Sequence, residues 1–299
     1  MAMLELQGLR KRFGEKEVLR GLHLTVPEHS IFGFVGQNGA GKTTTMKIIL
    51  GLLRADEGEV LVNGERVLYG CADTNRFVGY LPDVPSFYSF MTAAEYLRFC
   101  GETAGMTRAE ITGRTEELLS LVGLASEKSR IKGFSRGMKQ RLGIAQALLN
   151  RPRLLICDEP TSALDPVGRK EILELLMAVK EQTTVLFSTH ILSDVERICT
   201  DVAFLHDGVI GMQGSLSQIK SRYRREEYSL ELADDAAMLA VKKAFPLARQ
   251  EGENRLLICQ EDHDAARVLR FVADGRLPLS RWEKREPTLE SVFMEVMGK

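Results

Sequence analysis

A glycine-rich loop between a buried strand and a helix is the feature that most restricts how this chain can fold. Residues 31–35 form a short continuous apolar run, which is typical of a strand buried inside a sheet. Residues 36–43, the phosphate loop, fit the pattern G-x-x-x-x-G-K-[ST], and residues 43–53 are predicted to form a helix. A strand, this loop and a helix in that order form a phosphate-binding unit. We therefore expect an α/β fold with an anion site at the end of this strand.

Each residue type in the phosphate loop suits the phosphates of a nucleotide. Glycines let backbone N–H groups turn inward around an anion, and a helix N-terminus adds partial positive charge. Lys42 can reach the β- and γ-phosphates, the Thr43 hydroxyl can bind Mg²⁺, and Thr44 is a further donor. The predicted phosphate contacts are Gly36, Asn38, Gly39, Ala40, Gly41, Lys42, Thr43 and Thr44.

A dinucleotide site is the alternative interpretation of the same loop. The stretch also contains G-x-x-G-x-G, and Asp56 and Glu57 follow about 20 residues later, where such a site places an acidic residue. That interpretation leaves Lys42 and Thr43 without a role. The sequence therefore favours a binding site for a nucleoside triphosphate.

Two carboxylates follow a second buried strand. Residues 154–157 are apolar, and Asp158 and Glu159 come directly after them. The carboxyl ends of parallel strands are where an α/β sheet presents its ligand-binding groups. We expect Asp158 to hold Mg²⁺ and Glu159 to polarise an attacking water, because phosphoryl transfer depends on positioning and charge stabilisation.

The rest of the chain alternates between strands and helices, which predicts a mostly parallel sheet covered by helices. A helical insert interrupts this order, and a small α/β appendage follows a charged stretch at residues 222–227. We expect one domain at residues 1–222 and an accessory domain at 223–299. The predicted strands are 4–9, 22–26, 31–35, 59–62, 154–157, 184–188, 228–232, 255–259 and 279–282. The predicted helices are 43–53, 92–104, 108–122, 135–149, 169–180, 192–199, 236–245, 265–272 and 289–297.

Composition excludes several other classes of protein. The net charge of −1 over 299 residues gives no sign of the basic face that duplex binding needs. No apolar run approaches the roughly 20 residues that cross a bilayer, so we expect a cytosolic chain. The five cysteines are scattered, with no C-x-x-C pair, and are expected to be reduced thiols.

With these motifs in place, the chain resembles the ABC ATPase family. Residues 134–141 (Phe-Ser-Arg-Gly-Met-Lys-Gln-Arg), here called the signature segment, match that family's signature. Residues 160–165 resemble its D-loop, and residues 188–190 resemble the strand end that carries its switch histidine. By this resemblance Ser135 and Gly137 would contact ATP held by a second subunit, and Phe13 would stack on adenine. His190 would contact the γ-phosphate and act with Lys42 and Glu159 as the catalytic set.

The resemblance implies a fold and an activity. The fold would be a P-loop NTPase of ABC ATPase type, with a mostly parallel core, an antiparallel β subdomain and a helical signature subdomain. Residues 286–293 resemble the ending of ATP-binding subunits that serve type-2 exporters. We therefore expect an ATPase using ATP and Mg²⁺, paired with a second copy and with a polytopic membrane permease, on the inner face of the cell membrane.

Two positions depart from the family pattern. Asp83 stands where the family usually has the glutamine of its Q-loop, and Arg136 replaces a signature glycine. We expect Asp83 to serve as the Q-loop residue with weaker coupling to the metal. The sequence leaves open whether the Arg136 side chain faces solvent, the membrane partner or the nucleotide.

Two other functions compete with transport. One is a non-transport ABC ATPase that acts on nucleic acid or the ribosome, and the near-neutral charge disfavours it. The other is a nucleotide-binding module without catalytic activity, in which the appendage is the functional part. The complete set of Lys42, Asp158, Glu159 and His190 argues against that second alternative.

Overall fold

The chain forms two compact units in a computed structural model that describes residues 2–222, 226–260, 263–285 and 288–297. The larger unit contains Met1–Ser217 and Phe293–Lys299, and the smaller unit contains Gln218–Val292. The predicted domain boundary falls at residue 223, outside the described residues, and it stays a prediction.

The centre of the larger unit is a six-stranded sheet of order β10-β9-β3-β8-β7-β6. All neighbouring strands are parallel except β10, which runs antiparallel to β9. The strands are β3 (Ile31–Gly36), β6 (Val78–Leu81), β7 (Leu154–Asp158), β8 (Thr184–Thr189), β9 (Asp201–His206) and β10 (Val209–Ser215). Every residue of β3, β7 and β8 is buried, which explains why these strands are continuous apolar runs.

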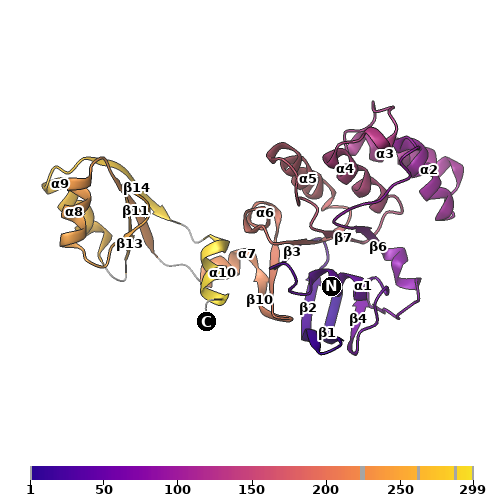
Figure 1. The fold of residues 1–299 in the computed structure, drawn as a ribbon, viewed down its shortest axis with the longest axis horizontal. Helices are drawn as coiled ribbons and strands as arrows, with labels where there is room; N and C mark the ends of the chain where they lie inside the picture. The colour runs from indigo at the N-terminus through magenta and orange to yellow at the C-terminus, as the bar shows by residue number, and fades with distance from the viewer. Residues whose placement is uncertain (1, 223–225, 261–262, 286–287, 298–299) are drawn as a thin grey trace. The chain divides into compact units, whose positions relative to one another are not determined.

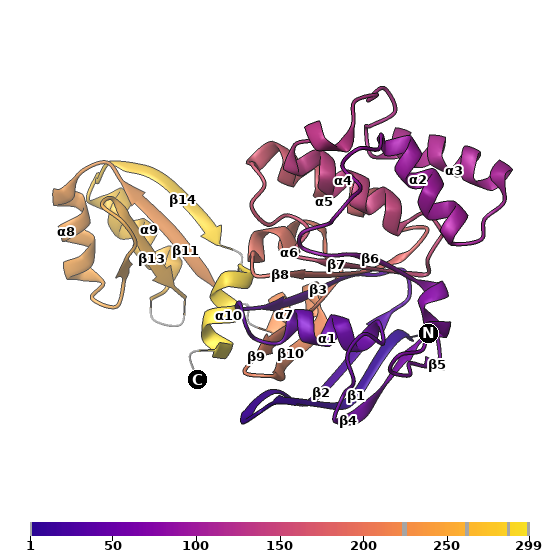
Figure 2. The same cartoon turned by 45° about the vertical axis from the view of Figure 1, so that its right-hand side comes forward.

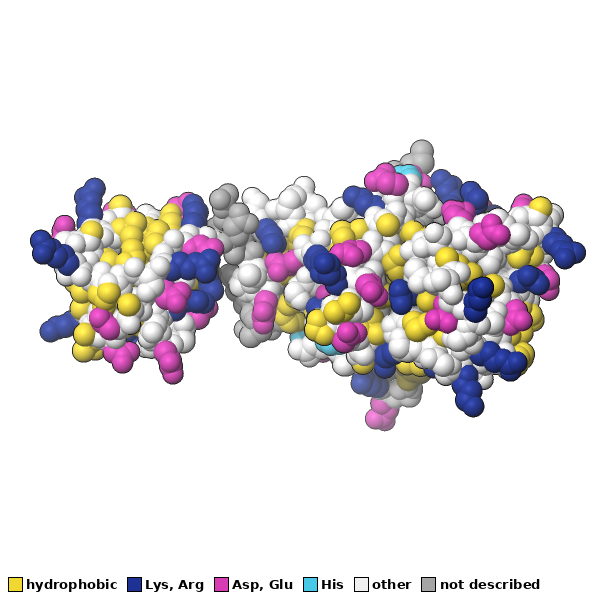
Figure 3. Space-filling model, turned by 90° about the horizontal axis from the view of Figure 1, so that it is seen from above, with side chains coloured by type: hydrophobic (Ala, Val, Ile, Leu, Met, Phe, Trp, Pro, Cys, Tyr) yellow, Lys and Arg dark blue, Asp and Glu magenta, His cyan; other side chains and the backbone are white. Residues whose placement is uncertain are grey.

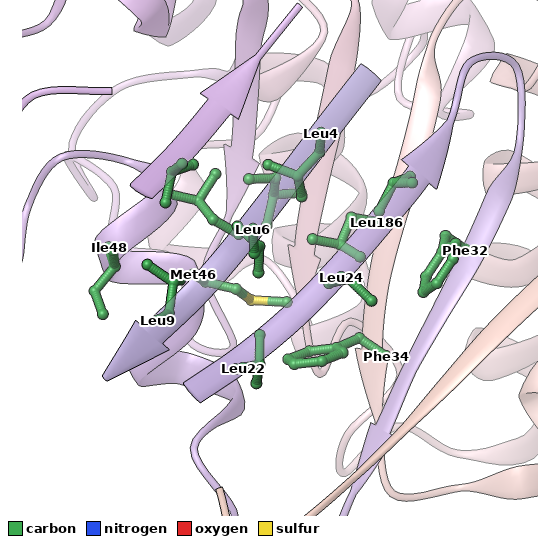
Figure 4. Close-up of a cluster of buried hydrophobic side chains, with 14 of the residues drawn as sticks. Leu4, Leu6, Leu9, Leu22, Leu24, Phe32, Phe34, Met46, Ile48 and Leu186 are labelled. Atoms are coloured by element: carbon green, nitrogen blue, oxygen red, sulfur yellow. The ribbon is translucent and has the colours of Figure 1, made fainter. Parts of the chain in front are cut away.

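A second, antiparallel sheet of order β2-β1-β4-β5 packs against the chain's first helix. Its strands are β1 (Ala2–Phe13), β2 (Lys16–Pro27), β4 (Glu57–Val62) and β5 (Glu65–Arg66), and the helix is α1 (Lys42–Ile49). Leu6, Leu9 and Leu24 from this sheet meet Phe34 of β3 and Met46 of α1 in one buried cluster (Figure 4). This core fixes the position of α1, and therefore of the phosphate loop that precedes it.

The predicted helical insert lies between β6 and β7, on the side of the central sheet opposite α1 (Figures 1 and 2). It contains α2 (Ala93–Thr103), α3 (Arg108–Leu121) and α4 (Arg136–Ala147), with a short 3₁₀ turn at Ile131–Gly133, whereas the 3₁₀ turn at Asp73–Phe77 precedes β6. Thr92 and Thr107 open α2 and α3 with capping boxes to Glu95 and Glu110. These hydrogen bonds hold the pKa of each glutamate carboxyl below its usual value.

The other helices of the larger unit are α5 (Pro166–Val179), α6 (Leu192–Ile198) and the end of α10 (Leu289–Met297). Asp165 caps α5 and Pro166 occupies its first turn, so the sequence itself marks this helix start. The helix α7 (Leu216–Arg222) spans the junction of the two units. None of the helices in the described part of the chain has the length and apolar character needed to cross a bilayer.

The smaller unit has the strand–helix–strand–strand–helix–strand order of a ferredoxin-like fold. Its elements are β11 (Glu227–Leu232), α8 (Asp235–Ala244), β12 (Arg249–Gln250), β13 (Arg255–Cys259), α9 (Ala265–Asp274) and β14 (Leu279–Arg285). The antiparallel sheet has the order β12-β13-β11-β14. Leu230 and Ile258 of the sheet pack with Val241 and Val268 of the two helices, so this unit has a core of its own.

The structure differs from the sequence prediction in several places. The hairpin of β9 and β10, the helix α7 and the two-residue strands β5 and β12 were not predicted. The helix predicted at 43–53 ends at Ile49, because Gly51 adopts a φ of 68° and the Leu52 N–H bonds back to the Lys47 carbonyl. The five cysteines are free thiols. Burial raises the pKa of the Cys157 and Cys199 thiols, so both act as small apolar residues.

Candidate nucleotide-binding site

Most of the predicted site residues converge on a pocket of about 500 Å³ in the larger unit, whereas Gly36, Ala40, Ser135 and Gly137 do not line it. The phosphate loop, β1, and the segments that follow β6, β7 and β8 all contribute to it. Its lining is Phe13, Val18, Asn38, Gly39, Gly41, Lys42, Thr43, Thr44, Asp83, Asp158, Glu159, Ser162 and His190. The parallel register brings the ends of β7 and β8 side by side, with Asp158 opposite Ser188.

The phosphate loop bends on glycines that other residues could not replace. Gly39 and Gly41 adopt φ values of 84° and 114°, and a Cβ on Gly41 would lie 2.8 Å from the Leu19 Cδ2 atom. Lys42 follows as the first residue of α1. Its side chain is 6% exposed, and its Nζ donates to the carbonyls of Gly36 at 2.6 Å and Gln37 at 3.2 Å. The ammonium group is therefore held inside the loop.

Asp158 is buried and fixed by hydroxyl groups on both sides. Thr43 Oγ1 donates to its Oδ2 at 2.8 Å, and Ser188 Oγ donates to its Oδ1 at 2.7 Å. Burial, followed by the negative charges of Asp158 and Asp83, raises the pKa of Tyr80 to about 12. Burial of the phenol is the main cause of the raised pKa, and the negative charges of the two carboxylates at the ends of β6 and β7 add to it.

The Glu159 carboxylate lies between two nitrogen groups. Lys42 Nζ is 3.1 Å from its Oε1, and His190 Nδ1 is 3.0 Å from its Oε2. The contact with Lys42 is an ion pair without hydrogen-bond geometry, so the buried Oε1 keeps its capacity to accept a hydrogen bond. Glu159 adopts a φ of 48°, an unusual backbone conformation for a residue with a side chain.

Phe13 and Asp83 lie at the rim of the pocket. The Phe13 ring is 50% exposed, and Lys11 Nζ lies 5.4 Å from its centroid. Asp83 follows β6, and Gln140 of α4 donates from Nε2 to its backbone carbonyl at 2.9 Å. The Asp83 Oδ1 atom is buried without a hydrogen-bond partner among the described residues.

The signature segment does not line this pocket. Ser135 caps α4 by accepting from the Met138 N–H, and Gly137 lies in the first turn of that helix. Arg136 is half-exposed, and its Nη2 is 3.7 Å from Asp83 Oδ1. The two residues that depart from the family pattern are therefore neighbours in the same subunit.

The residues at the pocket floor fit a Mg²⁺ ion. Mg²⁺ prefers oxygen ligands and is commonly held by one or two carboxylates together with substrate phosphates. Thr43 and Asp158 offer a hydroxyl and a carboxylate 2.8 Å apart, next to the phosphate loop. No cluster of three or more His, Cys, Asp or Glu side chains suited to a metal occurs in the described part of the chain. Phosphate oxygens would therefore complete the ligand set.

Sequence reasoning gave two residues of this site no role. Ser188 is buried and links both acidic residues, because its Oγ also accepts from the Glu159 N–H at 3.0 Å. A serine at the end of an apolar strand is the signal that could have identified it. Val18 lines the pocket beside Phe13, and nothing in its own sequence context marks it.

Comparisons with known proteins agree with the resemblance described above. Residues 19–162 match the ABC transporter family, and residues 214–297 match the C-terminal domain of DrrA1-3-like ATP-binding proteins. The chain is 35% identical to an uncharacterized ABC transporter ATP-binding protein, YxlF, of Bacillus subtilis, with 99% of each chain covered. It is 32% identical to the bacitracin transport ATP-binding protein BcrA of Bacillus licheniformis, with 99% of this chain and 97% of that protein covered.

A solved structure extends the comparison to the fold. An ATP-binding cassette in a dimeric post-hydrolysis state with ADP and Pi superposes with a TM-score of 0.64. The two chains are 26% identical, and the aligned region covers 72% of this chain and 99% of the cassette. The predicted fold class and the predicted ATPase activity are confirmed by these likenesses, and the nucleic-acid alternative finds no support in them. The chain belongs to the family of ABC transporter ATP-binding proteins, which couple ATP hydrolysis to transport across a membrane.

Proposed function

We propose that this chain binds ATP in the pocket at the phosphate loop and hydrolyses it with Glu159 as the general base. The phosphate loop and Lys42 bind the phosphates, and Phe13 stacks on the adenine. His190 orients Glu159 and contacts the γ-phosphate. The observation that carries the proposal is the Glu159 carboxylate, which is 12% exposed, lies between Lys42 and His190, and has one oxygen without a hydrogen-bond partner among the described residues.

Mg²⁺ fits this proposal as the partner of ATP, held by Thr43 and Asp158, with Asp83 nearby. When bound, it would neutralise charge on the phosphates. The chain's own contribution is to fix the two ligands, because Ser188 and Thr43 restrain the Asp158 carboxylate from opposite sides.

The position of the signature segment supports a pair of subunits, most simply two copies of this chain. Ser135 and Gly137 lie outside the pocket of their own subunit, so their proposed contact with ATP requires a second one. ATP at such an interface holds the pair closed, and hydrolysis releases it. ATP can drive this change between the open and the closed pair only if it binds the closed pair more tightly.

A groove of about 660 Å³ offers a surface for the membrane permease. Tyr88, Tyr96 and Phe99 line it, and Tyr88 and Phe99 pack edge to face at 5.4 Å between centroids. The groove follows the segment that begins at Asp83, so movement of the nucleotide pocket can reach it. We place the chain on the inner face of the cell membrane, where it drives an exporter. The match to the DrrA1-3-like domain and the likeness to BcrA support this.

The accessory domain proposed at residues 223–299 includes most of the smaller unit. On the face shown in Figure 3, Lys and Arg side chains are interspersed with Asp and Glu. A duplex-binding face gathers positive charge, so this surface supports a permease rather than nucleic acid as the partner.

Hydrolysis of ATP by the purified full chain tests the proposed function. With Mg²⁺ the chain is expected to release phosphate from ATP steadily. Removal of the metal with EDTA is expected to reduce the rate by at least about a hundredfold, because the phosphate charge is no longer neutralised. Equal rates with and without EDTA, or no phosphate release at all, would exclude the proposal.

Replacement of Phe13 by alanine is expected to weaken ATP binding about tenfold, because stacking of a base on an aromatic ring contributes about 1–3 kcal/mol. Titration with a fluorescent ATP analogue measures the Kd. Phe90→Ala is the matched control, since Phe90 is 62% exposed and lies outside the pocket. If both variants bind with the same Kd, Phe13 does not contact adenine.

Replacement of Asp83 by alanine is expected to raise the Mg²⁺ concentration for half-maximal hydrolysis about tenfold, the usual size of an outer-shell effect on metal affinity. The reason is the Asp83 carboxylate at the pocket rim, which can hold water around the ion. Asp73→Ala serves as a control on a nearby exposed turn. An unchanged Mg²⁺ titration would show that Asp83 is not the Q-loop residue.

A further inference from the structure

A buried carboxylate, Asp194, connects the two loops that carry the proposed hydrolytic pair. Its side chain is only 3% exposed. Thr161 Oγ1 donates to Asp194 Oδ2 at 2.8 Å, and Arg169 Nε donates to Oδ1 at 2.6 Å. Arg169 also donates from Nη2 to Ser193 Oγ at 2.9 Å. Both oxygens of the carboxylate are therefore used, each by a different segment of the chain.

These contacts join segments that lie close to the reacting groups in sequence but outside the pocket. Thr161 is two residues after Glu159, and Asp194 is four residues after His190. Thr161 is 2% exposed and does not line the pocket, so its hydroxyl has no route to a nucleotide. The hydrogen bond from Thr161 to Asp194 thus links the same two segments of the chain as the contact between Glu159 and His190.

The loop that Thr161 belongs to needs such a restraint. Glu159 and Ala163, two residues before and two residues after Thr161, adopt φ values of 48° and 51°. Residues with side chains hold this conformation only where the surrounding structure enforces it. The Thr161 hydroxyl is placed midway between the two strained residues, where one hydrogen bond restrains both.

The group that accepts the hydrogen bond from Thr161 is a charged carboxylate rather than a neutral side chain. Burial of a carboxylate is costly unless it is paired and hydrogen-bonded, and a neutral side chain would satisfy Thr161 equally well. Asp194 meets the condition through Arg169, whose α5 helix begins directly after the Thr161 loop. One side chain therefore fixes α6, α5 and the loop between β7 and α5 relative to one another.

From these contacts we propose that Asp194 and Thr161 are positioning residues for hydrolysis. They hold the Glu159 loop against the His190 segment so that the two side chains stay within 3.0 Å of each other. The inference rests on the proposed function, in which Glu159 and His190 act on ATP. It adds that their alignment is set by a buried contact that no nucleotide touches.

Thr161→Val tests this directly, because valine keeps the shape of threonine and removes only the hydroxyl. We expect kcat for ATP hydrolysis to fall about tenfold, with KM for ATP within about twofold, since misplacement of a reacting group lowers the rate of the chemical step. Thr161→Ser is expected to restore kcat to within about twofold. Thr183→Val is the matched control: Thr183 is also 2% exposed but precedes the opposite end of β8.

Two further measurements separate positioning from other roles. In a double-mutant cycle, Thr161→Val is expected to lower kcat less in the Asp194→Asn background than in the wild-type chain, because both changes weaken the contact between Thr161 and Asp194. Specific activity is measured at several protein concentrations, since this loop also resembles one that lines the subunit interface. Recovery of Thr161→Val at high concentration would assign the defect to pairing and overturn the inference.

The outcomes also distinguish this inference from the proposed function. If the wild-type chain hydrolyses ATP and Thr161→Val has an unchanged kcat, the inference is rejected and the proposed function stands. A loss in Thr161→Val that serine does not restore, or that Thr183→Val shares, points to general instability and also counts against it. A wild-type chain without hydrolysis rejects the proposed function itself.

Discussion

Replacement of Glu159 by glutamine is expected to lower kcat for ATP hydrolysis by about a thousandfold while ATP binding stays intact. Glutamine has nearly the same shape, so the phosphate loop and Lys42 keep their geometry. It has no basic oxygen to take a proton from water, and general base catalysis contributes about 10²–10⁴-fold. Single-turnover hydrolysis measures the rate, and titration with a fluorescent ATP analogue measures the binding.

The same variant is expected to accumulate as an ATP-bound pair of subunits, because the step that releases the pair no longer occurs. Size-exclusion chromatography with ATP and Mg²⁺ detects that species. Glu181→Gln is a suitable control, since Glu181 is exposed and lies after α5, away from the pocket. Hydrolysis by Glu159→Gln at the wild-type rate would remove Glu159 from the role of general base.

Replacement of Gly79 by alanine is expected to lower the free energy of unfolding of the larger unit by about 3 kcal/mol, at the upper end of overpacking effects. A Cβ at Gly79 would lie 2.1 Å from the Ala147 carbonyl oxygen and 3.0 Å from Pro152 Cγ. The first of these atoms is backbone at the end of α4, so it cannot move aside cheaply. Strand β6 and helix α4 would have to separate.

Urea denaturation can assign this loss to one unit. Trp282 is the chain's only tryptophan and lies in the smaller unit, so its fluorescence reports that unit. Circular dichroism at helical wavelengths reports mainly the larger one. We expect the circular dichroism transition to move to lower urea and the fluorescence transition to move less. Gly113→Ala is the control: nothing lies within 4 Å of a Cβ there, and alanine in α3 should stabilise by about 0.5–1 kcal/mol. Equal stability of Gly79→Ala and Gly113→Ala would contradict the packing described here.

The residues at the ends of the central strands could be predicted because one local pattern determines each of them. The phosphate loop needs its glycines and Lys42 in a fixed order, and Asp158 and Glu159 follow an apolar strand directly. The structure brings these residues into one pocket with Phe13, Asp83 and His190. Their assignment to individual steps of hydrolysis stays a prediction, which the variants above test.

The contacts that could not be predicted depend on distant parts of the chain. Asp83 and Arg136 were interpreted as two separate departures, yet Arg136 Nη2 lies 3.7 Å from Asp83 Oδ1. The link between Thr161 and Asp194 likewise spans 33 positions. Only the packing of the helices against the sheet determines which of many charged residues meet, and no local pattern records it.

A local sequence pattern marks the turn of the hairpin formed by β9 and β10. Asp207 and Gly208 connect the two strands, and both adopt positive φ values, 45° and 77°. An Asp-Gly pair between apolar runs is a strong indication of a two-residue hairpin turn. The end of α1 was misjudged because residues 50–53 remain apolar, whereas the backbone already turns at Gly51.

Isolation of the full chain from detergent-solubilised membranes of its native host tests the central claim most directly. The account predicts recovery of a polytopic membrane protein in roughly equimolar amount, and its loss when Tyr88 in the groove is changed to aspartate. Tyr88 is 50% exposed, so this change should leave the subunit folded. Recovery of the chain with ribosomes or nucleic acid, and without a membrane protein, would contradict the account.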